Sequence, residues 1–439
     1  MSLKKLLLLL LLLILFPSNA WAVTTFSTTF CSSGCDYTLP STATAALDNA
    51  ANIKNASNLA KTGSWNTQIG SNIADNAAIT WDIGARAGTL IHMTATQYLI
   101  KCTTTTDCTN LGNLDVVTDG VNSFVVNGAP DSPIIRIECA ENATFNDTFT
   151  VTMGTATNSD ATNYMIVGVQ EAYRHNGTSS TGCKVQTTAN SFTVSLGSHS
   201  SKVEWLRIGE SISSASNIGC FRTSNSFGNW NLGGHNLIIE NCNSSGAGVW
   251  FGAQLSHSAN TGNPVNYIAN SIIYGSEGNG VVFDGVATGV DCSAWNNTVY
   301  GNGGWGFTAG GNGLQVLKNN LACANASGDY QGTYDTFTTS GSCDTTGSVA
   351  GLQNLVGSTE FVNTASDYHL KAGATSIDAG TDLGTTPTNV QFDIDNYDRD
   401  TTAVTWDVGA DEYVASGGGT PPRAGIAGSL IGGSYLGGL

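Results

Sequence analysis

Charged residues are scarce in this 439-residue chain, at 11% of the sequence, and basic residues are scarcer still, with 16 lysines and arginines against 33 aspartates and glutamates. The formal net charge of −17 makes a phosphate backbone a poor partner, so we do not expect nucleic acid binding. Disordered chains combine low hydrophobicity with high charge. Here 41% of the residues are hydrophobic, so the chain can bury a sizeable core.

Metal-binding cysteine motifs are also missing, because no Cys-x-x-Cys pair and no histidine cluster has the spacing of metal ligands. We therefore expect structural roles for the 11 cysteines. Several pairs are close enough in sequence to close local loops, and Cys220 and Cys242 stand about one coil of a repeat fold apart. The expected disulfides are Cys31 with Cys35, Cys102 with Cys108, Cys220 with Cys242, and Cys323 with Cys343. Cys139, Cys183 and Cys292 remain, and the odd total leaves at least one thiol unpaired or intermolecular.

Long apolar runs are absent after the N-terminus. Lys4 and Lys5 precede an apolar run from Leu6 to Phe16, and Ala20-Trp21-Ala22 offers small residues for cleavage. This pattern predicts a signal peptide over residues 1–22. A membrane anchor is the alternative, but the run is shorter than the ~20 residues that span a bilayer. We expect a secreted, extracellular or cell-surface protein with no transmembrane span after signal removal.

Repeated blocks fill the middle of the chain. Four short apolar segments each end in asparagine, at Asn241, Asn270, Asn297 and Asn320, spaced 29, 27 and 23 residues apart. Three of them are followed by a glycine-rich turn and a second apolar segment, at 248–251, 280–283 and 306–309. Strands this short bury a face only by stacking coil on coil. The repeats predict a parallel β-helix rather than an antiparallel sandwich, because the blocks resemble one another.

The two ends of the solenoid need covers. Residues 44–53 share an apolar face and predict a short N-terminal capping helix. A glycine and proline linker begins near residue 416, and residues 426–439 are apolar and rich in glycine, as in a sorting or attachment tail or a disordered end. We expect residues 23–415 to form one β-helix, including the cap and a C-terminal closing coil, and residues 416–439 to form a linker and tail.

Several motifs resemble a known family. They are Asp36-Tyr37-Thr38, the stretch from Asp147-Thr148-Phe149-Thr150 to His175-Asn176-Gly177, Phe361-Val362-Asn363, Asp367-Tyr368-His369-Leu370, Ser376-Ile377-Asp378-Ala379-Gly380, Asp395-Asn396, Arg399, and Asp407 to Tyr413. The chain is similar at these positions to secreted pectin-lyase-like right-handed parallel β-helix repeat proteins. The resemblance implies an all-β, right-handed parallel β-helix and export. It leaves activity open, because that superfamily includes lyases, hydrolases, epimerases, adhesins and phage tail proteins.

The catalytic motifs of such enzymes are incomplete here. The Gly-His-Gly and Arg-Ile-Lys tripeptides of polygalacturonase-like hydrolases do not occur in the chain. Lyase-like members use an Arg or Lys base, and Arg207 is one basic residue of the repeats. It lies between Leu206 and Ile208, so strand alternation points it outward, where an ordinary solvated role competes with substrate binding. No catalytic residue is assigned.

Strand alternation also predicts an outer column of side chains. If Phe251, Phe283 and Ala309 point inward, then Trp250, Val282 and Thr308 stack on the outside with Asp284 beside them. An exposed indole suits a sugar ring, although a neighbouring loop could cover it instead. The candidate polysaccharide-binding residues are Trp250, Asp284 and Thr308, with Arg207.

The densest oxygen cluster follows residue 392. Its carboxylates at Asp393, Asp395, Asp398 and Asp400 suit calcium, which takes 6–8 oxygen ligands. The competing interpretation is a structural motif in which Arg399 pairs with one of these acids. We expect no required cofactor, with calcium as the candidate.

Two functions remain from the sequence. The first is a monomeric, adhesin-like protein that binds an extracellular or surface polysaccharide without catalysis. The alternative is a polysaccharide lyase or a related carbohydrate-active enzyme.

Overall fold

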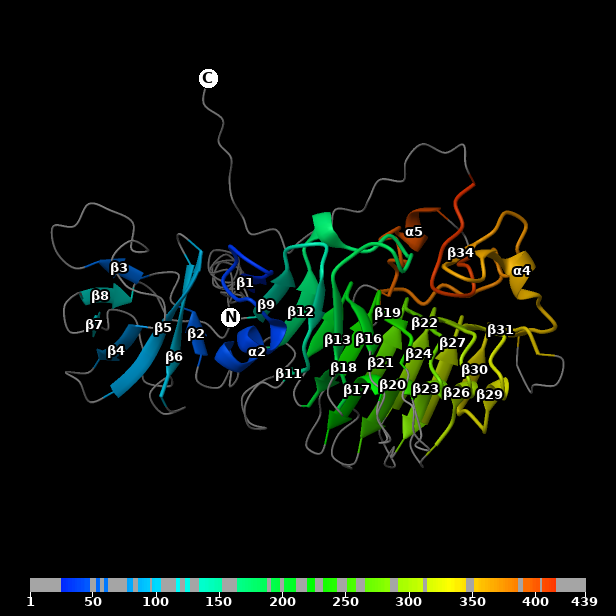
Figure 1. Ribbon diagram of the computed structural model, residues 1–439, viewed down its shortest axis with the longest axis horizontal. Coiled ribbons are helices and arrows are strands. Elements are labelled where there is room, and N and C mark those ends of the chain that lie inside the picture. The colour runs from blue at the N-terminus through cyan, green and yellow to red at the C-terminus, as the bar shows by residue number, and fades with distance from the viewer. Residues whose placement is uncertain are drawn as a thin grey trace, which may run out of the picture. The chain divides into compact units, whose positions relative to one another are not determined.

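The computed structural model describes the backbone of two units, which are presented separately below (Figure 1). The described residues are 25–47, the strands between 53 and 126, 134–151, 164–187, 191–197, 201–210, 219–225, 232–242, 251–257, 265–284, 291–310, 314–344, 351–385, 390–402 and 405–415. The expected signal peptide, Trp250, Cys108 and the expected linker and tail lie outside these residues. No helix among the described residues is long and apolar enough to cross a membrane.

The smaller unit is an antiparallel sheet within the range that the sequence predicted as one continuous β-helix. Its seven strands run in the order β2-β6-β5-β4-β7-β8-β3. They are β2 (Ile53–Asn55), β3 (Leu59–Lys61), β4 (Ala77–Trp81), β5 (Arg86–Thr94), β6 (Gln97–Cys102), β7 (Val116–Thr118) and β8 (Ser123–Val126). Short connections explain the departure: β5 and β6 lie two residues apart, whereas parallel neighbours need a crossover of about a dozen residues or more.

The larger unit is a right-handed parallel β-helix built from three sheets, as the sequence predicted. Each complete coil contributes one strand to each sheet, and neighbouring strands of these sheets from β9 to β32 pair in parallel. Sheet 1 contains β1 (Thr25–Phe30), β9 (Ile134–Cys139), β12 (Met165–Val169), β15 (Lys202–Glu204), β18 (Leu232–His235), β21 (Val265–Ala269), β24 (Asp291–Trp295), β27 (Leu314–Lys318) and β30 (Thr336–Thr338).

Sheet 2 contains β10 (Thr144–Asn146), β13 (Lys184–Thr187), β16 (Arg207–Glu210), β19 (Ile238–Glu240), β22 (Ile272–Tyr274), β25 (Thr298–Tyr300), β28 (Leu321–Cys323), β31 (Ser340–Ser342) and β32 (Gly351–Leu352). Sheet 3 contains β11 (Phe149–Val151), β14 (Val194–Leu196), β17 (Gly219–Asn225), β20 (Phe251–His257), β23 (Asn279–Asp284), β26 (Trp305–Thr308) and β29 (Gly328–Gln331).

Inward side chains stack in columns through the coils. Phe221, Ala253, Val281 and Phe307 are direct partners on successive strands of sheet 3, and all four are fully buried. Phe307 stacks on Tyr330 of the next coil with ring centroids 5.2 Å apart. The apolar core therefore runs along the axis of the solenoid, shared by strands too short to form it alone.

Asparagines occupy the corner between sheets 1 and 2, but in a different register from the predicted one. Asn236, Asn270, Asn296 and Asn319 hold this corner with φ between 48° and 53°. The amide of Asn296 donates to Asn270, and that of Asn319 donates to Asn296, at 2.9 and 3.0 Å. Asparagine tolerates this left-handed backbone conformation, and its amide forms a hydrogen bond with the asparagine of the neighbouring coil. These two properties explain why asparagine recurs at this corner. Asn297 and Asn320 form a second pair one residue later, and Asn241 lies at the next corner.

The first coils carry the predicted capping helix, which begins earlier than expected. Helix α2 (Pro40–Leu47) lies beside β11 and overlaps the helix predicted over 44–53 only at 44–47, while Ile53 begins β2 and residues 48–52 lie outside the described residues. Proline at its first position suits a helix start, because the missing N–H would have no partner there.

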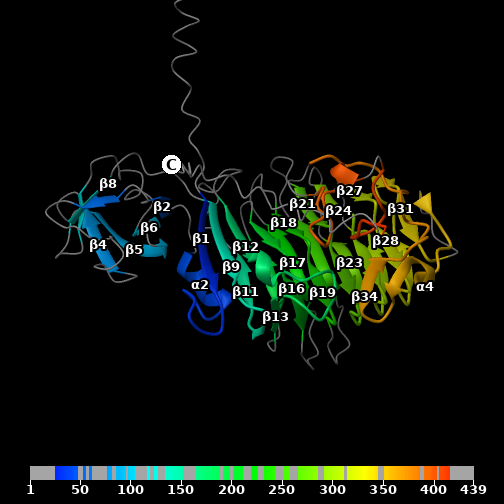
Figure 2. The same cartoon turned by 90° about the horizontal axis from the view of Figure 1, so that it is seen from above.

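Residues 355–413, here called the closing segment, fold back over the outer face of sheet 2 (Figure 2). The segment includes α4 (Gly357–Glu360), β33 (Phe361–Asn363), β34 (Asp367–Leu370) and α5 (Arg399–Thr402). Its Tyr368, Leu370, Ile394 and Val408 bury the outward side chains of sheet 2, which include Ile238, Ile272 and Leu321. The sequence placed this segment at the end of the solenoid, whereas Asn236 donates to the carbonyls of Phe392 and Asp393, several coils back.

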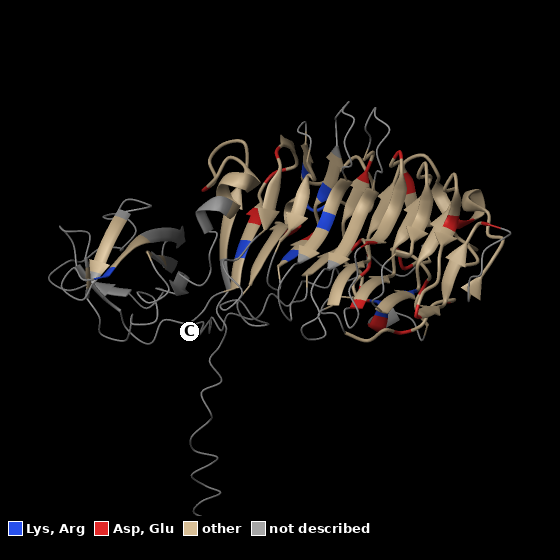
Figure 3. Cartoon of the chain, turned by 90° about the horizontal axis from the view of Figure 1, so that it is seen from below, with Lys and Arg blue, Asp and Glu red and all other residues tan. Residues whose placement is uncertain are grey.

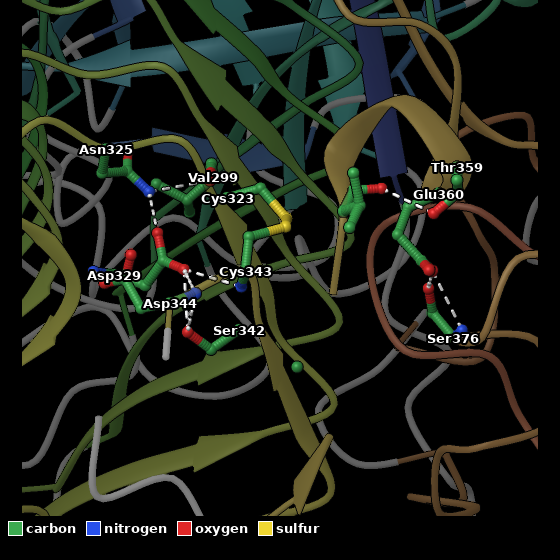
Figure 4. Close-up of a disulfide and its surroundings, with 12 residues drawn as sticks. Val299, Cys323, Asn325, Asp329, Ser342, Cys343, Asp344, Thr359, Glu360 and Ser376 are labelled. Atoms are coloured by element: carbon green, nitrogen blue, oxygen red, sulfur yellow. Dashed lines mark hydrogen bonds between the residues drawn. A yellow bond between two sulfur atoms is a disulfide. The ribbon is translucent and has the colours of Figure 1, made fainter. Parts of the chain in front are cut away.

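Disulfide bonds link neighbouring parts of the coils. Three of the expected bonds are present, Cys31–Cys35, Cys220–Cys242 and Cys323–Cys343, and a fourth joins Cys139 to Cys183. Cys292 is a buried free thiol, and the expected Cys102–Cys108 bond involves an undescribed residue. Figure 4 shows Cys323–Cys343 next to the buried carboxylate of Asp329, which accepts hydrogen bonds from Ser342 Oγ and Cys343 N at 2.8 Å.

Candidate functional site

The outer face of sheet 3 presents one continuous row of mostly polar side chains, here called the polar row. Strand pairing aligns its members directly from coil to coil. In chain order they are Ser195, Arg222, Gln254, Val282, Thr308 and Gln331. Since parallel strands are about 4.8 Å apart, these six positions form a regular ladder across the sheet.

Three contacts hold the side chains of this face in place. Arg222 Nε donates to Ser195 Oγ at 2.8 Å, and the guanidinium carbon lies 4.6 Å from the centre of the Phe192 ring. Gln254 Nε2 donates to Asp284 Oδ2 at 2.7 Å. Partial burial lowers the pKa of Arg222, although the group stays cationic in water near neutrality. The face thus offers a fixed cation, an amide and a carboxylate on adjoining strands.

Two predicted residues, Thr308 and Asp284, share this face. Thr308 pairs with Val282, and Asp284 follows Val282 by two residues on β23, so both side chains point outward on neighbouring strands. Asp284 is exposed, and Thr308 Oγ1 has no hydrogen-bond partner among the described residues. The carboxylate of Asp284 is therefore placed to accept a hydrogen bond from a ligand, whereas the hydroxyl oxygen of Thr308 is shielded from solvent although its side chain lies on the outward side of the strand.

The register differs from the predicted one at β20. Phe251 pairs with Asn279, and Leu255 pairs with Phe283, so the position beside Val282 belongs to Gln254. The predicted alignment of Phe251 with Phe283 is wrong by four residues. Similar apolar residues at 249–251 and 253–255 made the two alignments hard to separate from sequence. Trp250 itself lies outside the described residues.

Arg207 lies on a different face from the polar row. It belongs to β16 of sheet 2, points outward as predicted, and donates to Glu240 Oε1 at 2.7 Å. Lys184 contacts the same oxygen at 2.9 Å, and Tyr274 donates to Glu240 Oε2 at 2.5 Å. Burial alone would raise the pKa of Glu240, but Arg207 and these partners lower it overall. Arg207 is thus part of a half-buried ion network, not the solvated residue that the sequence suggested.

A pocket of about 240 Å³ lies within the closing segment. Asp393 and Asp395, two of the four predicted calcium ligands, line it together with His369 and Asp411, whereas Asp398 and Asp400 are not among its lining residues. The pocket thus contains only two of the four carboxylates that the sequence predicted as calcium ligands.

His369 is held between carboxylates. Its Nδ1 lies 2.5 Å from Asp367 Oδ1, and its Nε2 lies 3.3 Å from Asp395 Oδ2. Burial opposes the charged imidazolium, but Asp367 and Asp395 outweigh it and raise the pKa of His369 to about 11. Burial raises the pKa of Asp411, and more strongly that of Asp393, and the nearby Asp395 carboxylate adds to both increases.

Arg399 forms the ion pair that the sequence analysis considered, but with an acid outside the 393–400 cluster. Its NH1 donates to Glu412 Oε2 at 2.8 Å, and both side chains are buried. Burial still raises the pKa of Glu412 to about 7 and that of nearby Asp407 to about 6, despite the attraction of Arg399. This pair joins α5 to the last part of the closing segment and is structural.

Basic side chains on the β-helix strands are concentrated in its first half (Figure 3). Arg136, Lys184, Lys202, Arg207 and Arg222 all precede β18, and after it only Lys318 lies on a described strand. The polar row beyond Arg222 is therefore lined by uncharged groups and Asp284.

The comparisons with known proteins are sparse. No protein-family model matches the chain, and no curated protein matches it. A solved structure titled "Crystal structure of pectate lyase Pel9A" is similar at 14% identity and a TM-score of 0.25, over 64% of this chain and 88% of that one. The fold is accordingly argued from the three parallel sheets of the chain itself.

Sequence reasoning missed three residues of these sites. Arg222 and Gln254 belong to the polar row only through strand register, which short strands leave ambiguous. His369 was visible inside Asp367-Tyr368-His369-Leu370, where alternation on a strand places Asp367 and His369 on one side. That spacing was the available signal for the pair.

Proposed function

We propose that the protein binds an extracellular or cell-surface polysaccharide along the polar row of sheet 3, as a secreted, adhesin-like protein of the pectin-lyase-like kind. The observation that carries the proposal is the ladder itself, in which successive coils present Arg222, Gln254 and Thr308 at the spacing of strands. A repeating surface suits a repeating polymer, because each further sugar meets a similar set of groups.

The chemistry of the row supports a sugar ligand. Gln254 and Asp284 are already hydrogen-bonded to each other, so they are ordered before a ligand arrives. Asp284 is exposed, so its carboxylate can accept a hydrogen bond from a sugar hydroxyl. Val282, which is 7% exposed, supplies a small apolar contact between them.

Secretion is part of the same proposal. Four disulfides among the described residues suit an oxidising compartment, and the N-terminal signal-peptide pattern fits export. We further propose that the protein acts as a monomer, since a single β-helix presents the whole row.

A panel of neutral and acidic polysaccharides tests the proposal. The purified mature protein should be retained on at least one immobilised polymer, and the midpoint of its thermal unfolding should rise in the presence of that polymer. Failure of every polymer to retain the protein would remove polysaccharide binding from consideration.

A polysaccharide lyase is the second candidate, and Arg222 is the observation that favours it. Its guanidinium is fixed on the outer face of sheet 3, and a basic side chain is the kind of group that β-elimination uses to remove a proton. The same panel separates the two functions, because a lyase leaves new unsaturated ends that absorb in the ultraviolet. Binding without such ends, on acidic polymers in particular, supports the non-catalytic function.

A further inference from the structure

Three metal-ligating side chains converge in the pocket of the closing segment. One ligand atom from each of His369, Asp395 and Asp411 lies within 4.8 Å of the others. They come from β34, from the turn that follows Asp393 and from the end of the segment, so tertiary folding alone brings them together. None of the three belongs to the polar row of sheet 3.

The imidazole of His369 is oriented as in many metal sites. Asp367 binds its Nδ1 at 2.5 Å, and a carboxylate on the far nitrogen is the usual partner of a metal-bound histidine. Nε2 then points at Asp395, 3.3 Å from Oδ2, and makes no hydrogen bond among the described residues. Two tetrahedral ligands with bonds of about 2.0–2.1 Å lie about 3.4 Å apart, which matches this separation.

Asp411 adds a second observation, independent of the histidine. Its side chain is 5% exposed, and Leu370 N donates to Oδ2 at 2.7 Å. Asp411 lines the pocket together with His369 and Asp395. A carboxylate buried to this degree requires a compensating cation or donor.

The backbone leaves space for this arrangement at Gly177. A Cβ atom built there would lie 2.2 Å from His369 Nε2 and 3.3 Å from Asp395 Oδ1, and the residue has φ +74°. Any side chain at this position would enter the cluster. The backbone at Gly177 thus packs against His369, and the adjoining pocket of about 240 Å³ has room for water.

We propose that His369, Asp395 and Asp411 bind a divalent transition metal ion, of which Zn²⁺ is the best match, while Asp367 holds the imidazole of His369 through Nδ1. Imidazole nitrogen favours such ions over calcium, which takes oxygen ligands. With three protein ligands, a water molecule completes a tetrahedral shell. The ion links β34 to the two later parts of the closing segment and so stabilises the packing of this segment on sheet 2.

This site differs in position from a calcium site at Asp393, Asp395, Asp398 and Asp400, because it requires His369 and Asp411 and leaves Asp398 and Asp400 aside. The two alternatives make opposite predictions for single substitutions. Asn keeps the size and the acceptor oxygen of Asp, so Asp411→Asn retains the bond from Leu370 N.

The test is Zn²⁺ titration by calorimetry, with the mature protein freed of any polyhistidine tag and stripped with chelator. We expect one saturable site, at least tenfold weaker in Asp411→Asn and about 10–100-fold weaker in Asp367→Asn, the range for changes to a residue that holds a metal ligand. The matched controls Asp398→Asn and Asp400→Asn should bind as the unsubstituted protein does. Absence of saturable Zn²⁺ binding, or equal affinity in all variants, would overturn the proposal and leave His369 as an ion-paired imidazolium.

Two further measurements keep the result clear. Co²⁺ in place of Zn²⁺ should give the strong visible absorption of a four-coordinate ion in the unsubstituted protein and not in His369→Gln, with circular dichroism showing that the variant is folded. Calcium binding that is lost in Asp398→Asn would instead support the four-aspartate site. Polysaccharide retention should be the same with and without Zn²⁺, so failure of the metal proposal is distinguishable from failure of the proposed function.

Discussion

Sheets 2 and 3 belong to the same coils, yet their outer faces differ from β19 onward. Sheet 2 directs Ile238, Ile272 and Leu321 outward, and the closing segment buries all three. Sheet 3 directs Arg222, Gln254 and Thr308 outward, and these remain partly exposed. Backbone geometry is shared between the sheets, so the outward residues alone decide which face is covered.

This difference separates stability from recognition. Apolar outward residues on sheet 2 turn that face into a second core beside the solenoid axis, with Tyr368 against both Tyr274 and Tyr300 at centroid distances of 5.0 and 5.1 Å. Polar outward residues on sheet 3 bury little apolar area, so they can change with small cost to folding. Substitutions on sheet 2 should therefore act on unfolding, and those on sheet 3 on binding.

The largest effect is expected from the buried ion pair that holds the cover together. Arg399→Met leaves Glu412 without its partner, and breaking a buried pair costs about 3–5 kcal/mol. The free energy of unfolding from denaturant titration measures this loss, with Lys371→Met, an exposed lysine of the same segment, as the control. Equal stability of the two variants would mean that Arg399 does not hold the cover.

Matched alanine substitutions on the two faces compare them directly. Leu321→Ala removes a fully buried side chain packed under the closing segment and should lower the free energy of unfolding by about 2–5 kcal/mol. Thr308→Ala removes a hydroxyl without a partner in the described residues and should change it by less than about 0.5 kcal/mol. A large loss from Thr308→Ala would show that sheet 3 is covered as well.

The acids of the closing segment predict a pH dependence. The pKa of Glu412 rises to about 7 and that of Asp407 to about 6 in the folded protein, so the folded state binds these protons more tightly than the unfolded state. Their stabilising contribution is present below pH ~4 and is lost as the pH rises through about 6 to 7. Each group contributes at most about 1.4 kcal/mol per pH unit.

Thermal unfolding midpoints between pH 5 and pH 8 test this dependence. The midpoint should fall with rising pH, and the fall should be smaller in Glu412→Gln, whose side chain cannot ionise. Burial lowers the pKa of His175 to about 4, so this residue changes the stability with pH in the opposite direction. Its contribution is the same in both proteins and cancels when the midpoint curve of Glu412→Gln is subtracted from that of the unsubstituted protein. Parallel curves would contradict the assignment to Glu412.

The sequence predicted the parallel β-helix because its repeated asparagines and glycines report local backbone geometry. Asn270 and Asn296 show this, since each holds a left-handed corner. The register of the strands was harder to predict, because Val249 and Phe251 resemble Ala253 and Leu255 in spacing and in apolar character. Only the pairing with the neighbouring coil determines which of the two sets aligns with Val281 and Phe283. Contacts between distant segments, such as His369 with Asp395, depend on the path of the closing segment, which no local pattern reveals.

The central claim is that polysaccharide binds the outer face of sheet 3, and two matched glutamines test it most directly. Gln254 on sheet 3 bonds Asp284, and Gln186 on sheet 2 bonds Asn146, so both are outward amides with one polar neighbour. On the polymer that the panel selects, the Kd of Gln254→Ala combined with Arg222→Ala should rise about tenfold or more, while that of Gln186→Ala should stay unchanged. Unchanged affinity in the sheet 3 variant, or an equal loss in the sheet 2 variant, would contradict the account.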